Sequence, residues 1–143
     1  MMDNNSKTIL TIATILIDLA LVTALTTCSL GTYDKLFVIV CLMAHIPFYA
    51  CLWNYNRPIL DALHYFLFAA LVASIFLNHP LTLSISLSVL VFIQVMWVLK
   101  DRCILNEEGQ SIANSFGFGP TFSFLTGGFT LLVATKLGQA CVA

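Results

Sequence analysis

Two titratable side chains stand in the middle of long apolar runs, where proteins rarely place them. Asp18 lies in the run 8–28, and His45 lies in the next run, 36–53. If both runs are antiparallel membrane-crossing helices, the two side chains reach a similar depth. Such a pair either holds or relays a proton, or forms a hydrogen-bonded contact that fixes helix register. The sequence leaves both interpretations open.

Asp18 also continues a polar stripe on its own helix. Thr11, Thr14 and Asp18 share one face at helical spacing. A carboxylate facing lipid is costly to keep ionised, so this face is expected to look inward. The sequence therefore predicts that Asp18 is buried, with His45 or a threonine hydroxyl within hydrogen-bond reach.

The surrounding elements follow from composition. Of the 143 residues, 59% are hydrophobic and 9% are charged, whereas soluble domains average about 45–50% and about 25%. A helix needs roughly 20 apolar residues to cross a bilayer. We predict an all-α polytopic transmembrane helical bundle of about five spans, with the lipid bilayer as its solvent. It is a single domain covering 1–143, with spans at about 8–28, 36–53, 59–77, 81–99 and 117–138.

A cleaved signal peptide is the alternative for the first run, but the run exceeds the usual core of about 7–15 residues.

The third and fourth runs are joined only by 78–80, which predicts that their helices are antiparallel neighbours. Residues 81–88 alternate apolar and polar, the pattern of a strand. We predict a helix instead, because a lone strand in lipid leaves its backbone unpaired.

Smaller features predict how the helices meet. Ala69, Ala70, Ala73 and Ser74 form a small-residue face that lets another helix approach closely. Gln94 is expected to hydrogen-bond a neighbouring helix. In the last run, Gly127 and Gly128 predict a thin waist. This weaker run either spans the membrane or re-enters it, and we predict that it spans.

Charge predicts the orientation. With five spans, four cationic residues fall on one side and two on the other: Lys7, Arg57, Lys100 and Arg102 against Lys35 and Lys136. The positive-inside rule then places the N-terminus in the cytoplasm and the C-terminus on the opposite side. Three aromatic residues are expected to anchor the cytoplasmic interface: Trp53, Tyr55 and Trp97.

Several function classes lack support in the sequence. The net charge of −1 offers no basic patch for nucleic acid. The five cysteines form no Cys-x-x-Cys pair, and no Cys/His cluster has zinc spacing. No triad, metal site or cofactor motif is visible, so we expect a protein that is not an enzyme and has no cofactor.

One short segment resembles a known pattern. Trp97, followed by 103–105 and by Glu107-Glu108, is similar to the Trp…Cys-x-Leu-Thr…Glu signature of small uncharacterised multi-span proteins of bacteria and large DNA viruses. Asn106 stands where that signature has Thr. The resemblance implies a small membrane protein of unknown activity, which in a virus would belong to a virion's internal membrane.

These observations favour a structural or accessory subunit of a membrane assembly, partnered by other membrane-protein subunits or by further copies of itself. The rival hypothesis is a proton-coupled transporter or channel that uses Asp18 and His45.

Overall fold

The computed structural model describes residues 4–54, 56–100 and 122–142, and no strand occurs among them. These residues form one short 3-10 helix and five α-helices: α1 (Asn4–Thr27), α2 (Thr32–Asn54), α3 (Arg57–Ala73), η1 (Ser74–Phe76), α4 (Pro80–Lys100) and α6 (Phe122–Val142). The prediction of an all-helical bundle is confirmed.

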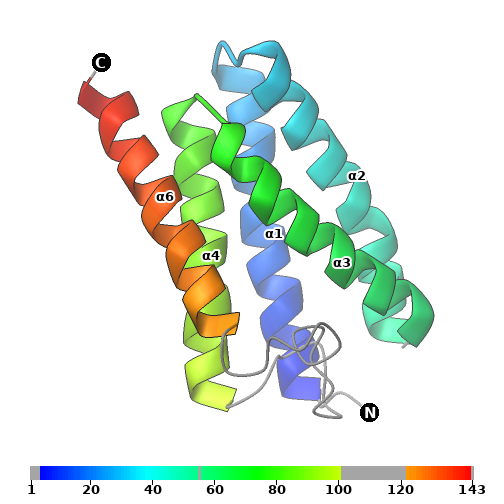
Figure 1. Ribbon diagram of the computed structural model, residues 1–143. Coiled ribbons are helices and arrows are strands. Elements are labelled where there is room, and N and C mark those ends of the chain that lie inside the picture. The colour runs from blue at the N-terminus through cyan, green and yellow to red at the C-terminus, as the bar shows by residue number, and fades with distance from the viewer. Residues whose placement is uncertain (1–3, 55, 101–121, 143) are drawn as a thin grey trace.

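Consecutive helices alternate in direction, so the start of α1 and the end of α6 lie at opposite ends of the bundle (Figure 1). The most extensive packing is between α4 and α6. In addition, α1 packs against both α2 and α4, and α3 packs against α2. The site discussed below therefore depends on the pairing of α1 with α2.

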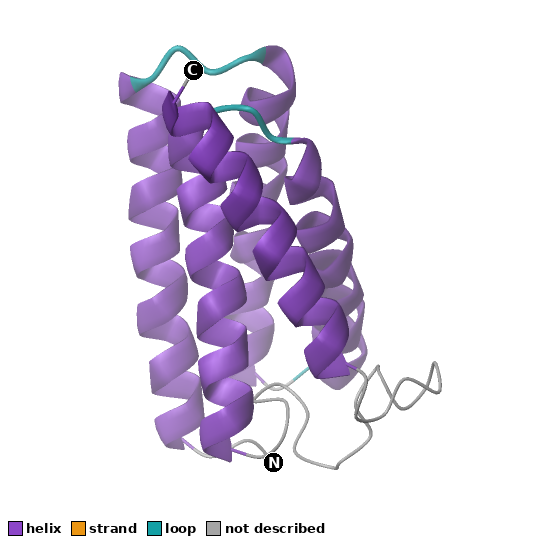
Figure 2. Ribbon diagram, turned by 60° about the vertical axis from the view of Figure 1, so that its left-hand side comes forward, coloured by secondary structure: helices purple, strands orange, loops and turns teal. Residues whose placement is uncertain are grey.

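The arrangement of α3 and α4 differs from the prediction. The two helices are joined through η1 but then separate, because α3 runs obliquely against α2 while α4 packs with α6 and α1 (Figures 1 and 2). The 3-10 turn and the extended backbone of Leu77 redirect the chain between them. The small residues Ala69, Ala70 and Ala73 border the space between α2 and α3, as expected of a face that meets another helix.

The outer surface of the bundle is apolar. Four segments are long and apolar enough to cross a membrane: Asn4–Thr27, Thr32–Asn54, Arg57–Phe76 and Pro80–Leu99. Only 17–28% of the residues in their apolar windows are buried inside the protein. In water this surface would expose far more contiguous apolar area than soluble proteins tolerate. The chain is therefore a membrane-embedded helical bundle.

The packing of α4 against α6 combines aliphatic contacts with a polar contact. Leu83 and Leu90 of α4 and Val133 of α6 are fully buried in the same cluster. The Gln94 amide donates to the Thr130 hydroxyl at 2.7 Å, and that hydroxyl in turn donates to a carbonyl of its own helix. The prediction that Gln94 bonds a neighbouring helix is confirmed.

The alternating segment at the start of α4 is helical, as predicted. The hydroxyl of Ser84 donates to the carbonyl of Pro80 at 2.8 Å, and that of Ser88 to the carbonyl of Ser84 at 2.9 Å. Such bonds let Ser and Thr occupy a helix in lipid, since each polar hydroxyl is satisfied within its own helix.

The last helix includes both glycines of the predicted waist without a break. A Cβ added at Gly127 or Gly128 would meet nothing within 4 Å, so no neighbouring group approaches there. Residues 117–121 of the predicted fifth span lie outside the described residues. That α6 crosses the membrane remains a prediction.

A buried carboxylate caps α4 from a different helix. Asp34, in the first turn of α2, is only 2% exposed. It accepts hydrogen bonds from the backbone N–H groups of Asn78 (3.2 Å) and His79 (3.1 Å) and from the Thr82 hydroxyl (2.6 Å). The N–H groups at a helix start lack partners within the helix, and a carboxylate is well suited to accept from them. Asp34 was not among the residues that the sequence singled out.

Two further side chains donate to backbone carbonyls where α3 gives way to η1. The Tyr33 hydroxyl donates to the Ala73 carbonyl at 3.0 Å, and the Lys136 ammonium donates to the Ile75 carbonyl at 2.9 Å. Helix ends leave such carbonyls unpaired, and lipid cannot pair them. The turn between α3 and α4 is therefore fixed by α2 and α6 as well as by its own backbone.

Candidate functional site

The middles of α1 and α2 are joined by a side-chain hydrogen bond. His45, through Nδ1, bonds Oδ1 of Asp18 at 2.5 Å. The short connection 28–31 makes α1 and α2 antiparallel partners, which brings these two residues to the same level. The structure thus brings together the two residues that the sequence singled out.

A third residue completes the network. The Tyr49 hydroxyl donates to Oδ2 of Asp18 at 2.9 Å. Both carboxylate oxygens of Asp18 are therefore hydrogen-bonded, Oδ1 to His45 and Oδ2 to Tyr49. The sequence analysis missed Tyr49, although it follows His45 by four residues and so occupies the same helix face. That spacing was the signal that could have identified it.

The network lies at the outer seam between α1 and α2 and is only partly enclosed. The side chains of His45 and Asp18 are 23% and 24% exposed. The expectation that Asp18 is buried within the bundle is therefore wrong in degree. Val22, one turn after Asp18 on the same helix face, is 46% exposed, so the described helices leave this side of α1 open.

The threonines of the predicted stripe are not partners of Asp18. The hydroxyl of Thr11 donates to the carbonyl of Lys7 and that of Thr14 to the carbonyl of Leu10, both at 2.8 Å. Each hydroxyl is thus satisfied by its own helix one turn earlier. Thr14 is buried, as the inward stripe predicts, but it borders an internal cavity instead of the Asp18 network.

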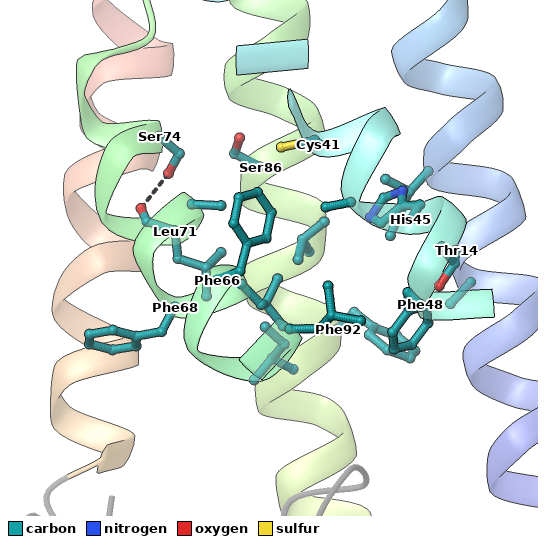
Figure 3. Close-up of a pocket in the computed structure, with 18 of the residues that line it drawn as sticks. Thr14, Cys41, His45, Phe48, Phe66, Phe68, Leu71, Ser74, Ser86 and Phe92 are labelled. Carbon is teal, nitrogen blue, oxygen red and sulfur yellow. Dashed lines mark hydrogen bonds between the residues drawn. The ribbon is translucent and has the colours of Figure 1, made fainter. Parts of the chain in front are cut away.

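That cavity has a volume of about 190 Å³ and lies among α1, α2, α3 and α4. His45 is one of its lining residues (Figure 3). The same imidazole therefore bonds Asp18 and borders the cavity. The remaining lining is mostly aliphatic and aromatic, including Phe48, Phe66 and Phe92.

The predicted interface anchors lie at one end of the bundle where the structure describes them. Trp53 is exposed in the last turn of α2, and Trp97 is near the end of α4, which finishes at the same end (Figure 1). Trp97 also borders the cavity. Tyr55 lies outside the described residues.

Other chemistry-bearing groups stay dispersed. Within the ranges that the structure describes, no three His, Cys, Asp or Glu side chains are grouped so as to hold a metal ion. In the first turns of α3, Oδ2 of Asp61 lies 3.9 Å from Nε of Arg57, and both side chains are exposed. An ion pair of this kind contributes little to stability.

The fold and the site define a membrane-embedded helical bundle with a polar network across one helix pair. Comparison of the chain with protein families, with curated proteins and with solved structures finds no match. Of the signature described above, Trp97 lies in α4, whereas 103–108 falls outside the described residues. The resemblance therefore stays a prediction.

Proposed function

We propose that this protein is a non-enzymatic, structural or accessory subunit of a membrane assembly. In this proposal, another membrane helix covers the seam between α1 and α2. That helix belongs either to a different subunit or to a second copy of this chain.

The partial exposure of the Asp18–His45–Tyr49 network carries the proposal. The Asp18 side chain is 24% exposed and does not line the cavity, so near the middle of a membrane-crossing helix its carboxylate would face hydrocarbon. Lipid chains supply neither hydrogen bonds nor counter-charge, and intramembrane ionisable groups almost always face protein or water. A covering helix removes this cost and gives the network a role in recognition.

Orientation and setting belong to the same proposal. The excess of Lys and Arg at one end of the bundle favours a cytoplasmic N-terminus, with α6 as a fifth span and the C-terminus on the other side. Thiol labelling from each side tests this arrangement: Cys141 should react only from the far side and Cys103 only from the cytoplasm. The signature around Trp97 further suggests a virion's internal membrane as the setting.

The size of the complex tests the proposal. After mild detergent extraction from its native membrane, the 15.7 kDa chain should migrate as part of a larger complex. Val22 lies one turn after Asp18 on the same face and is exposed. Val22→Trp should reduce the complex to the single chain, whereas Leu131→Trp on the outside of α6 should not. A wild-type chain that migrates alone would contradict the proposal.

The contact between Asp18 and His45 supports a second candidate, proton-coupled transport. His45 both bonds the Asp18 carboxylate and borders the cavity, so its imidazole is placed to pass a proton between that carboxylate and the cavity. Proton flux in reconstituted vesicles distinguishes the two functions, since an assembly subunit conducts none.

A further inference from the structure

The cavity among α1, α2, α3 and α4 contains one hydroxyl that the protein leaves unused. Ser86 lines the cavity and is 6% exposed, yet its hydroxyl has no hydrogen-bond partner among the described residues. In Figure 3 it lies between Ser74 of η1 and Cys41 of α2. No fully enclosed side-chain oxygen or nitrogen among the described residues lacks a partner, so the Ser86 oxygen keeps some accessible surface, and the cavity that Ser86 lines provides it.

The other hydroxyls around the cavity follow the usual pattern. Thr14 donates to the Leu10 carbonyl, and Ser74 donates to the Leu71 carbonyl at 2.7 Å. On α4 itself, Ser84 and Ser88 both bond back to their own helix. Among the described hydroxyls that line the cavity, only that of Ser86 makes no hydrogen bond within the protein.

The size and lining of the cavity indicate what could occupy it. A cavity of about 150 Å³ lined by Leu, Ile and Phe stays dry and binds benzene, and this one measures about 190 Å³. Its walls are mainly apolar, with contributions from Phe37, Phe66, Leu67, Ile85, Phe92 and Met96. A molecule with one aromatic ring and a few further carbons matches this volume. A charged molecule does not suit the site, because the walls are mainly apolar.

We infer that the cavity binds a small, uncharged, lipid-soluble molecule about the size of an alkylphenol, whose single oxygen hydrogen-bonds to Ser86. The ligand reaches the site from the bilayer. The cavity is partly open, and α3 and α4, which form two of its walls, separate beyond η1. This inference does not depend on the proposed function, because the outer seam and the cavity are occupied by different molecules.

Photolabelling tests the inference with a diazirine-bearing alkylphenol added to the full chain in phosphatidylcholine vesicles. The label should map to cavity residues such as Leu67 and Met96, and an excess of the same phenol without the diazirine should remove it. Ser86→Ala should weaken this competition by about tenfold or less, the effect of one hydrogen bond. Ser86→Leu, which fills the cavity, should abolish the labelling.

Ser88→Leu is the matched control, because it is the same change on the same helix at an exposed position outside the cavity. It should label like the wild type. Equal labelling of the Ser86→Leu and Ser88→Leu variants would overturn the inference, as would label confined to outward residues such as Leu16.

A phosphatidylcholine with a mid-chain diazirine serves as a second probe. If it labels the cavity and the phenol cannot displace it, the occupant is an acyl chain and the inference fails. Should Ser86→Leu not fold, competition in the wild type and in Ser86→Ala still decides.

Discussion

Asp18 and His45 share a hydrogen bond that links the middle of α1 to the middle of α2. Because Tyr49 donates to the other carboxylate oxygen, removing Asp18 would leave two side chains of α2 without their acceptor. The contact thus fixes the register of the two helices, and it does so at a surface that the protein itself only partly covers.

The stability of the bundle should depend on this network. We expect Asp18→Ala to lower the free energy of unfolding by about 1–3 kcal/mol, since it strips partners from His45 and Tyr49. Asp18→Asn should cost less, because an amide still accepts a hydrogen bond. Asp61→Ala is the control, at an exposed pair expected to contribute at most about 1 kcal/mol. Unfolding in mixed micelles measures all three, and equal losses for the two alanine variants would contradict the account.

Asp34 should contribute to the stability of the bundle at least as strongly as Asp18. Asp34→Ala removes the acceptor of two backbone N–H groups and of the Thr82 hydroxyl in a fully enclosed place. We expect a loss of at least about 1–3 kcal/mol, with Asp34→Asn intermediate. Amide hydrogen exchange supplies the local measurement: Asn78 and His79 should lose protection while the middle of α2 does not. Unchanged exchange at these two amides would show that Asp34 does not cap α4.

The contact between Gln94 and Thr130 offers a double-mutant cycle. Gln94→Leu and Thr130→Val each remove one partner, and the pair of changes isolates their coupling. We expect a coupling energy of about 0.6 kcal/mol, the average for hydrogen bonds between helices in membranes. A coupling of zero, measured by unfolding in detergent, would mean that the bond at 2.7 Å adds nothing to the packing of α4 with α6.

Proton movement separates the two candidate functions. An assembly subunit should show no pH-driven proton uptake when reconstituted into vesicles. If the wild type does take up protons, Asp18→Asn should abolish the flux in an assembled protein, because an amide cannot carry a titratable proton. Flux that is equal in both proteins would remove Asp18 from any relay.

The sequence predicted what depends on local pattern. Of the five predicted spans, the first four correspond to segments that are long and apolar enough to cross a membrane, and they could be located from the apolar runs alone. Asp18 and His45 could be paired because a short loop makes their helices adjacent. Of the two partners predicted for Asp18, His45 or a threonine hydroxyl, the sequence could not choose, because nothing in it shows that Thr11 and Thr14 bond their own helix.

The features that the sequence did not predict depend on how distant segments meet in the fold. The partners of Asp34 lie 44 to 48 residues further along the chain, so no spacing rule connects them. The link at 78–80 fixes only where α3 and α4 meet, and their later separation follows from the η1 turn and the packing of α3 on α2. The cavity arises from that separation and was therefore invisible in the sequence.

The most direct test asks what covers the seam between α1 and α2. A photo-crosslinking benzoylphenylalanine replaces Val22, which is 46% exposed one turn from Asp18, or Leu131 of α6, which is 71% exposed, in the full chain in its native membrane. We predict a protein adduct of one defined mass from position 22, reduced by Asp18→Ala, and none from position 131. The adduct mass distinguishes a second copy from another subunit. Lipid adducts alone at position 22 would contradict the proposed function.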